Sequence, residues 1–333
     1  MAYPSRTEIV TAFKNPQVCY KAVELIGGNI YYNKINVIQY AGGYTTVFPF
    51  KDKTGKKVAV RCWCADIGDA QKRSSAISDY LSREINQYFV NFKYVENAIL
   101  IKGELQPIII MDWVEGKPLK EYLSDNCDSK TFYAIAEKFK MMVADFHKRE
   151  IAHGDLQHGN ILVKSDGTLV VVDYDSMYID NLKGMYDVIK GLPGYQHPAR
   201  VQNQYVQPNL DYFSELVIYL SLLIFAENPK LWLNYCDAED LLFSKDDFSN
   251  IKQSTIYKQF QKSSNSAIAN LLKKLEEELA KSDIQQLLPL EDLLIDKLQK
   301  SFDDINNKWG NQPNPPQPRV FKIPEVKSIT DKF

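Results

Sequence analysis

Apolar and polar residues follow a strand-like pattern in the first third of this 333-residue chain. From Asn36 onward, short apolar runs are separated by the Gly42-Gly43 pair and by the polar turn KDKTGK, and such breaks are typical of β-hairpins. A helix is predicted from Asp69 to about Tyr88, because apolar side chains recur there at helical spacing. Strands are predicted at residues 36–40, 45–50, 57–63, 98–102 and 108–111.

Helices predominate in the remainder of the chain. The segment Lys130–Arg149 carries its large apolar residues on one stripe, as in a helix buried along one face. A strand–turn–strand is predicted at 160–163 and 168–172, and a helix from near Asp211 to Phe225. Amphipathic patterns continue to about Lys308. This succession predicts an α+β fold with a β-rich small lobe and a mainly helical large lobe.

The order of these elements also suggests how the chain is divided. The two-lobed domain is expected at residues 36–308. The tail contains the run NPPQP, so we expect it to be extended rather than packed. The expected divisions are an N-terminal extension (1–35), a small lobe (36–111), a hinge (112–116), a large lobe (117–308) and a proline-rich tail (309–333).

Composition and charge argue against several functional classes. A net charge of −2 and a pI near 6.2 are unusual for a general binder of nucleic acid or membrane surfaces. The N-terminus lacks the layout of a signal peptide, and the longest apolar run, residues 216–226, is too short to span a bilayer. Five cysteines without CxxC spacing indicate reduced thiols. We therefore expect a cytoplasmic protein with no nucleic-acid or membrane partner.

The segment AHGDLQHGNILV, followed by LVVVDYD, contains the polar residues that phosphoryl transfer requires. That reaction needs metal ions held against the phosphates and a base near the acceptor hydroxyl. Asp155 can act as the base, and Asn160 can bind a metal ion. Asp173 ends an apolar strand, where it can hold Mg²⁺, which prefers oxygen ligands.

These motifs resemble those of the protein-kinase superfamily over roughly residues 36–226. Asp155 and Asn160 match the loop that runs from HRD to its asparagine, and Asp173 matches the DFG aspartate. GLPGYQHP is similar to the end of an activation segment, with Pro198 at the proline of APE. The whole set is similar to eukaryotic-like bacterial Ser/Thr protein kinases of an atypical branch. The resemblance implies phosphate transfer from ATP, with Mg²⁺ or Mn²⁺, to a protein substrate that the sequence does not identify.

The same resemblance implies a nucleotide site in the small lobe and hinge. Arg61 stands where the family carries its ATP-contacting lysine, so it is a fourth candidate catalytic residue. Met111 matches the gatekeeper, Asp112 to Val114 would offer backbone groups to adenine, and Leu162 would lie beneath the ring. The implied nucleotide-binding residues are Gly42, Gly43, Tyr44, Val47, Ala59, Arg61, Met111, Asp112, Val114 and Leu162.

Two further residues are expected to support the site structurally. Asp211 resembles the aspartate at the start of the central large-lobe helix, which braces the catalytic loop. Glu84 is the expected acidic partner of Arg61, because it shares the apolar face of the predicted helix. Asp79 lies nearer the usual sequence separation but off that face.

The sequence departs from the family pattern at three positions that bear on activity. Gly154 replaces the arginine of HRD, so we expect activity that does not depend on phosphorylation of the activation segment. Gln157 stands where Ser/Thr kinases carry lysine. Ala199 replaces the glutamate of APE, and no arginine occurs between Arg200 and Arg319 to pair with such a glutamate.

Two alternatives remain open at this point. HGDLQHGN also resembles the loop of small-molecule kinases of the aminoglycoside and choline type, which lack the GLPGYQHP segment. A pseudokinase that binds nucleotide, or a pure interaction module, would fit Arg61 and the sparse glycine loop. Retention of Asp155, Asn160 and Asp173 favours an active phosphotransferase over such a module.

Overall fold

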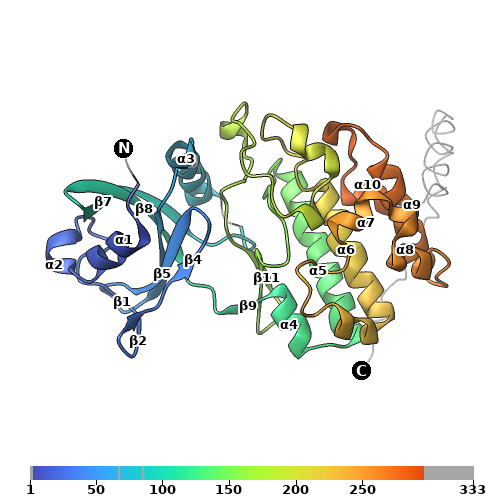
Figure 1. The fold of residues 1–333 in the computed structure, drawn as a ribbon, viewed down its shortest axis with the longest axis horizontal. Helices are drawn as coiled ribbons and strands as arrows, with labels where there is room; N and C mark the ends of the chain where they lie inside the picture. Colours follow the sequence, from blue (N-terminus) through green and yellow to red (C-terminus); the bar gives the residue numbers. More distant parts are fainter. Residues whose placement is uncertain (1–2, 67, 85, 296–333) are drawn as a thin grey trace, which may run out of the picture. The chain divides into compact units, whose positions relative to one another are not determined.

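A six-stranded antiparallel sheet dominates the first part of the computed structural model (Figure 1). The structure describes residues 3–66, 68–84 and 86–295, so the expected tail at 309–333 lies outside the described residues. The strands follow the order β1-β5-β6-β8-β7, with β4 beside β5. The elements are α1 (Arg6–Phe13), α2 (Pro16–Cys19), β1 (Asn29–Ile30), β2 (Tyr32–Asn33), β3 (Asn36–Val37), β4 (Tyr40–Ala41), β5 (Thr45–Lys51), β6 (Lys57–Trp63), α3 (Ala70–Arg83), β7 (Phe92–Ile101) and β8 (Glu104–Asp112).

The residues before the first predicted strand pack onto this sheet. Ser5 caps α1 in a reciprocal capping box with Glu8. The Phe13 ring of α1 lies 4.6 Å from the ring of Phe48 in β5, centroid to centroid. The described part of the segment 1–35 therefore shares the apolar core of the small-lobe sheet.

Several elements differ from the prediction. The strand expected at 36–40 is two short strands, β3 and β4, and the strand expected at 108–111 begins at Glu104, as β8. Helix α3 ends at Arg83 rather than near Tyr88, because Glu84 adopts an extended conformation with φ −101° and ψ 111°. Strand β7 begins at Phe92 rather than at Ala98. Its first half mixes exposed and buried side chains, and this weakens the apolar pattern from which strands are predicted.

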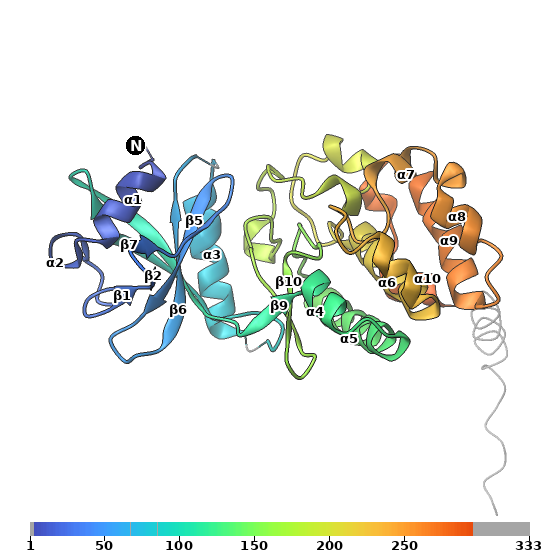
Figure 2. The same ribbon diagram turned by 60° about the horizontal axis from the view of Figure 1, so that its bottom comes forward.

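The large lobe is built around α6, which is buried on nearly all sides. Its residues 213–225 are all buried, and the helix packs against α5, α9 and α10 (Figures 1 and 2). A helix that is apolar all round requires such a central position. The elements of this part are β9 (Gly116–Pro118), α4 (Leu119–Asp125), α5 (Ser129–Lys148), β10 (Ile161–Lys164), β11 (Leu169–Val171), α6 (Tyr212–Glu227), α7 (Lys245–Ser249), α8 (Thr255–Phe260), α9 (Ser266–Leu279) and α10 (Leu290–Leu294).

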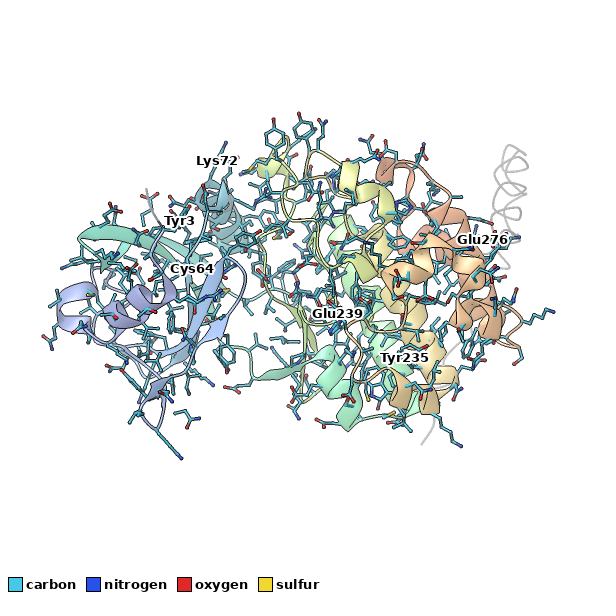
Figure 3. The ribbon with its side chains drawn as sticks, viewed as in Figure 1. Tyr3, Cys64, Lys72, Tyr235, Glu239 and Glu276 are labelled. Carbon is cyan, nitrogen blue, oxygen red and sulfur yellow. The ribbon has the colours of Figure 1, made fainter. Side chains whose placement is uncertain are left out.

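Polar contacts join the later helices to one another. Glu276 of α9 accepts a hydrogen bond from the Tyr257 hydroxyl at 2.7 Å and forms an ion pair with Lys252 at 2.7 Å (Figure 3). Across the described ranges, the search for helices long and apolar enough to cross a bilayer finds none.

A histidine between two carboxylates joins three of these helices. His147 of α5 contacts Glu215 of α6 through Nε2 at 2.8 Å and Glu291 of α10 through Nδ1 at 2.7 Å. Burial opposes protonation of this ring, but the hydrogen bonds and charges of the two glutamates outweigh it and raise the pKa of His147 to about 9. The protonated ring can donate to both carboxylates at once.

We expect His147 to make the stability of the protein pH-dependent. Its folded-state pKa lies above the usual value of 6.5, so its contribution is fully present below pH 6.5 and is lost as pH rises through about 9. His147→Gln should lower the free energy of unfolding at pH 7 by on the order of 2 kcal/mol. It should also flatten the fall in melting temperature between pH 7 and pH 10, measured by thermal unfolding.

Lys148→Gln is the matched control, because it removes an exposed charge from the same end of α5. A His147→Gln variant that keeps the wild-type pH profile would contradict the assignment.

Candidate active site

The catalytic loop is anchored by Asp211 at the start of α6. The buried carboxylate accepts hydrogen bonds from the backbone N–H of His153 and from that of Gly154, the latter at 2.9 Å. Burial raises the pKa of Asp211, and these hydrogen bonds act in the opposite direction. This is the bracing contact that the sequence predicts for Asp211.

Gly154 lies against the segment that follows the DYD motif. Its φ is +80°, in the left-handed region that favours glycine. A β-carbon at this position would lie 2.1 Å from the carbonyl oxygen of Ser176. An antiparallel bridge between Ala152 and Tyr178 holds the two segments side by side. The replacement of the HRD arginine therefore has a steric cause, since any side chain at position 154 would collide with backbone.

Asp155 and Asn160 lie together in this loop. The Asn160 Nδ2 donates to the Asp155 carbonyl at 2.8 Å and to its Oδ2 at 3.2 Å. The other carboxylate oxygen of Asp155, Oδ1, accepts the backbone N–H of Leu192 at 3.2 Å. The backbone N–H of Val172 donates to the Asn160 carbonyl at 2.9 Å, which ties the loop to the chain just before Asp173. The sequence predicts this grouping of Asp155, Asn160 and Asp173.

Arg61 of β6 lies between two carboxylates of the DYD motif. Its Nη1 is 3.3 Å from Asp173 Oδ1, and its Nη2 forms a close ion pair with Asp175 Oδ2. Arg61 is buried, whereas half of the Asp173 side chain is exposed. Burial opposes the charge of Arg61, but the two carboxylates outweigh this and raise its pKa. Asp173 also adopts a left-handed conformation, with φ +70°.

The expected pairing of Arg61 with Glu84 is wrong. Glu84 lies beyond the end of α3, and its carboxylate contacts Arg149 at 3.0 Å. The prediction extends the helix too far, so Glu84 does not lie on the helix face that the helical spacing assigns to it. Asp175 takes the role of the acidic partner instead. The sequence carries one signal for it, an aspartate at the third position of the motif, where the family motif DFG has glycine.

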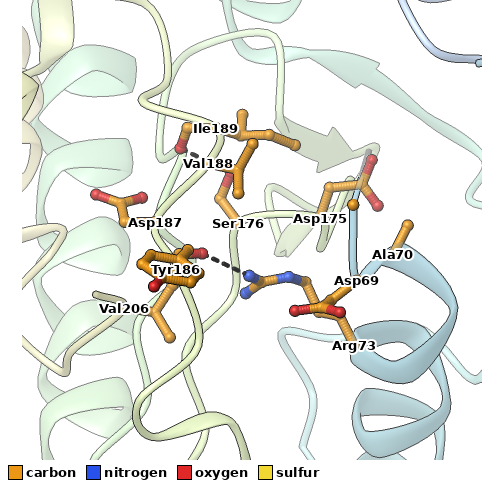
Figure 4. A pocket seen from close by; sticks show the side chains of 11 residues that line it. Asp69, Ala70, Arg73, Asp175, Ser176, Tyr186, Asp187, Val188, Ile189 and Val206 are labelled. Carbon is orange, nitrogen blue, oxygen red and sulfur yellow. Dashed lines mark hydrogen bonds between the residues drawn. The ribbon is translucent and has the colours of Figure 1, made fainter. Parts of the chain in front are cut away.

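The charged residue that helix α3 buries is Arg73, a cation, whereas the sequence predicts an acidic residue there. Arg73 is buried and donates from Nη1 to the Met177 carbonyl at 3.4 Å and from Nη2 to the Tyr186 carbonyl at 2.9 Å. A cavity of about 160 Å³ lies between this end of α3 and the activation segment (Figure 4). Asp175 and Asp187 both line it, so the cavity borders the residues that hold Arg61 and the segment in position.

The predicted nucleotide residues lie in the β4–β5 turn, on β5, β6, β8 and β10, and, for Val114, between β8 and β9. Gly42 closes the β4–β5 hairpin by donating to the Thr45 carbonyl at 2.9 Å, and the Tyr44 side chain is half exposed at its tip. In the six-stranded sheet Val47 pairs with Arg61 and Ala59 pairs with Met111. Leu162 lies in the separate three-stranded sheet β11-β10-β9, where it pairs with Val170 and Pro118.

The hinge has fewer free backbone hydrogen-bonding groups than the sequence predicts. The Asp112 N–H donates to the Asn91 carbonyl at 3.1 Å, and its carboxylate contacts Lys56 at 2.6 Å. Its N–H is therefore already engaged, which leaves Val114 as the better candidate for the backbone contact to adenine. Trp113 faces the Tyr40 ring at 6.1 Å, centroid to centroid.

The activation segment is held by a buried ion pair that the sequence did not reveal. Arg200 donates from Nη2 to Asp187 Oδ1 at 3.1 Å and from Nε to Oδ2 at 3.2 Å, and both residues are almost fully buried. Burial would raise the pKa of Asp187, but Arg200 outweighs it and keeps that pKa below the ordinary value. The sequence gives no motif that relates Arg200 to Asp187, thirteen residues earlier, and marks Arg200 only as the start of a stretch without arginine.

The fold and this site are those of a kinase-like phosphotransferase, with Asp155 and Asn160 in a loop beside strand β11, which the DYD motif follows. The model of the protein kinase domain matches residues 40–296. The chain therefore belongs to the protein kinase family.

Relatives and a solved structure agree with this family. The serine/threonine-protein kinase ppk6 of Schizosaccharomyces pombe is 26% identical over 156 residues, which cover 46% of this chain and 18% of that protein. The serine/threonine-protein kinase PrkC of Bacillus subtilis is 35% identical over 68 residues, 20% of this chain and 10% of that protein. The matches thus span less than a fifth of either relative. The kinase PK-1 of Cydia pomonella granulovirus shares the fold, with a TM-score of 0.52 and 18% identity over 82% of this chain and 96% of that chain.

We expect Gly154→Ala to destabilise the protein by at least about 2 kcal/mol, because it combines left-handed strain with a collision against Ser176. Chemical denaturation would measure the loss. Gly184→Ala separates the two causes, since Gly184 has φ +84° but no atom within 4 Å of the added carbon. Gly43→Ala, with neither feature, should leave stability unchanged. Equal stability of all three variants would refute the steric account of position 154.

Proposed function

We propose that the chain is an ATP-dependent protein phosphotransferase of the Ser/Thr type, with Asp155 as the base and Asn160 and Asp173 as ligands of Mg²⁺. The observation that carries this proposal is the joint arrangement of the three residues. Asn160 holds Asp155 through two hydrogen bonds. The backbone N–H of Val172, the residue before Asp173, donates to the Asn160 carbonyl and so ties Asp173 to this loop. The names of the relatives, which are Ser/Thr protein kinases, favour a protein acceptor.

The proposed metal ligands fit a hard cation. Because Asn160 donates through Nδ2 to Asp155, its amide oxygen faces away and is available as a ligand. Half of the Asp173 side chain is exposed, so its carboxylate can reach a ligand. Within residues 3–66, 68–84 and 86–295, no three His, Cys, Asp or Glu side chains form a preformed metal cluster. Mg²⁺ is usually bound by one or two protein oxygens plus phosphates and water.

Asp155 and Arg61 have separate roles in the proposed reaction. Asp155 accepts the proton of the acceptor hydroxyl as that oxygen forms its bond to the γ-phosphorus of ATP, and the bond from this phosphorus to ADP breaks. Bound Mg²⁺ would neutralise the phosphate charge. Arg61, oriented by Asp175, supplies a buried positive charge beside Asp173. The five free thiols suit the reducing cytoplasm that we propose as its location.

A second candidate function is nucleotide binding without transfer. The Arg61–Asp173 ion pair favours it, because Arg61 engages one oxygen of the proposed metal ligand. The two candidates differ in one measurable property, the transfer of phosphate to an acceptor.

Asp155→Asn and Asp173→Asn test the proposed reaction. Loss of the base should lower the rate of ³²P transfer from ATP to casein or to the chain itself by about 10²–10⁴. Asp173→Asn should also abolish the Mg²⁺-dependent rise in melting temperature that ATP produces. Asp180→Asn, an exposed acid in the same segment, is the control. Wild-type rates in both active-site variants would disprove the assignment, and an ATP-induced stabilisation without any transfer would identify the second candidate.

Arg61→Lys and Asp175→Asn test the altered cation. A single ammonium cannot contact both carboxylates as the guanidinium does, and removing Asp175 leaves a buried charge with one partner fewer. We expect each variant to weaken ATP binding about tenfold, or about 1.4 kcal/mol, as measured by titration calorimetry with Mg²⁺. Tighter binding or faster transfer by Arg61→Lys would instead identify Arg61 as an inhibitory substitution.

A further inference from the structure

The turn between β4 and β5 carries free backbone donors. In the described part of the chain, the backbone N–H groups of Gly43 and Tyr44 donate to no acceptor. Both residues are exposed, and a β-carbon on Gly43 would meet no atom within 4 Å. Successive free N–H groups in a turn can bind an anion such as phosphate. The position of this turn therefore decides whether its donors can reach the phosphates of ATP.

Two backbone hydrogen bonds and one side chain hold the turn in place. The Gly42 N–H donates to the Thr45 carbonyl at 2.9 Å, and the Cys64 N–H donates to the Tyr44 carbonyl at 2.8 Å. The side chain is that of Arg6, whose Nη2 donates to the Gly42 carbonyl. Among the described residues, no other side chain donates a hydrogen bond to the backbone of this turn. Arg6 is thus the side chain that ties the turn to another part of the small lobe.

The backbone that carries Arg6 is itself well fixed. Helix α1 begins at Arg6, and the capping box of Ser5 and Glu8 closes its first turn. Glu8 also forms an ion pair with Lys102 at 2.5 Å. At the other end of the helix, Phe13 is buried in the core that α1 shares with the sheet. The guanidinium therefore extends to the turn from a firmly placed helix.

Helix α1 lies on the side of the sheet that faces away from the expected nucleotide site. Phe48 of β5 pairs with Val60 of β6, and both pack in the core with α1. Val47 and Arg61 form the neighbouring pair, and successive residues of a strand point to opposite faces. The predicted nucleotide residues Val47 and Arg61 thus point away from α1. Arg6 holds the turn from behind and has no direct contact with the nucleotide to make.

The stability of α1 gives no reason for an arginine at this position. A cation in the first turn of a helix opposes the helix dipole. Arg6 is exposed, and within the described ranges its side chain has a single hydrogen-bond partner, the Gly42 carbonyl. Arg6 also lies outside residues 40–296, which match the kinase model. Its contact with the turn is therefore a feature of this chain that the family pattern does not account for.

We propose that Arg6 is a positioning residue of the nucleotide site. Its hydrogen bond to Gly42 holds the β4–β5 turn so that the N–H groups of Gly43 and Tyr44 face the phosphates of ATP. A turn that is already in place loses less conformational freedom when its ligand binds. The part of the ligand that this contact serves is the phosphate chain and not the adenosine. This inference rests on the proposed function, because it assumes that ATP binds beneath this turn.

The test compares Mg²⁺·ATP with adenosine, which has no phosphates, as ligands of the full chain. The variants are Arg6→Ala and Arg6→Lys, of which the second can still donate a hydrogen bond. Lys14→Ala is the control, because Lys14 is exposed at the other end of α1 and its side chain has no hydrogen-bond or ion-pair partner in the described part of the chain. Titration calorimetry gives the two dissociation constants, thermal unfolding gives the melting temperature, and ³²P transfer to casein and to the chain itself gives the activity.

We expect Arg6→Ala to weaken binding of Mg²⁺·ATP about three- to tenfold, the effect of losing one typical hydrogen bond. Its adenosine affinity and melting temperature should equal those of the wild type. Arg6→Lys should bind ATP more tightly than Arg6→Ala, and Lys14→Ala should bind both ligands as the wild type does.

Wild-type ATP affinity in Arg6→Ala would overturn the inference. An equal loss of ATP and adenosine affinity would overturn it as a general disturbance of the small lobe, and an equal loss in Lys14→Ala would overturn it as an effect of net charge. A wild-type chain that binds ATP but transfers no phosphate would overturn the proposed function, while the Arg6 comparison would still decide the inference. A wild-type chain that binds no ATP would overturn both.

Discussion

The close approach between the catalytic loop and the chain after DYD is the constraint on which the site depends. The Ala152–Tyr178 bridge and the contact of Gly154 with Ser176 leave no room for a side chain at position 154. The Asp211 carboxylate holds the catalytic loop by accepting hydrogen bonds from the backbone N–H groups of His153 and Gly154. The bridge and the contact between Gly154 and Ser176 fix the segments that carry Asp155 and Asp173 relative to each other.

The charges around Arg61 are arranged differently from the family pattern. The family pairs its small-lobe lysine with a glutamate from the helix, so movement of that helix can break the pair. Here the carboxylate comes from Asp175, two residues after the proposed metal ligand. Arg73 of α3 instead binds backbone carbonyls beyond the DYD motif. Arg61 is therefore oriented by the same tripeptide that carries Asp173, and α3 attaches to the activation segment.

Local patterns in the sequence were enough for the fold class and for placing Asp155 beside Asn160 in one loop. The stripe of helix α5 and the motif letters around Asp155 and Asp173 are short-range signals, and the structure carries both. The partner of Arg61 was not predictable in this way, because its choice depends on where α3 ends. In a longer helix Glu84 would share the face that carries the apolar residues. Because α3 ends at Arg83, Glu84 contacts Arg149 and not Arg61.

Contacts between residues close in sequence but not in any regular element were also missed. The Asp187–Arg200 pair joins two positions of one loop, and neither helical nor strand periodicity relates them. Although the two residues are close in sequence, their ion pair affects the whole activation segment. Removing one partner of a buried ion pair generally costs about 3–5 kcal/mol, and Lys190 and Asn203 also contact Asp187 here. A phosphate bound by the HRD arginine orders the activation segment in other kinases, and that arginine is replaced by Gly154. In this structure the buried Asp187–Arg200 pair holds the segment without such a phosphate. The pair therefore favours the expected activity that does not depend on phosphorylation of this segment.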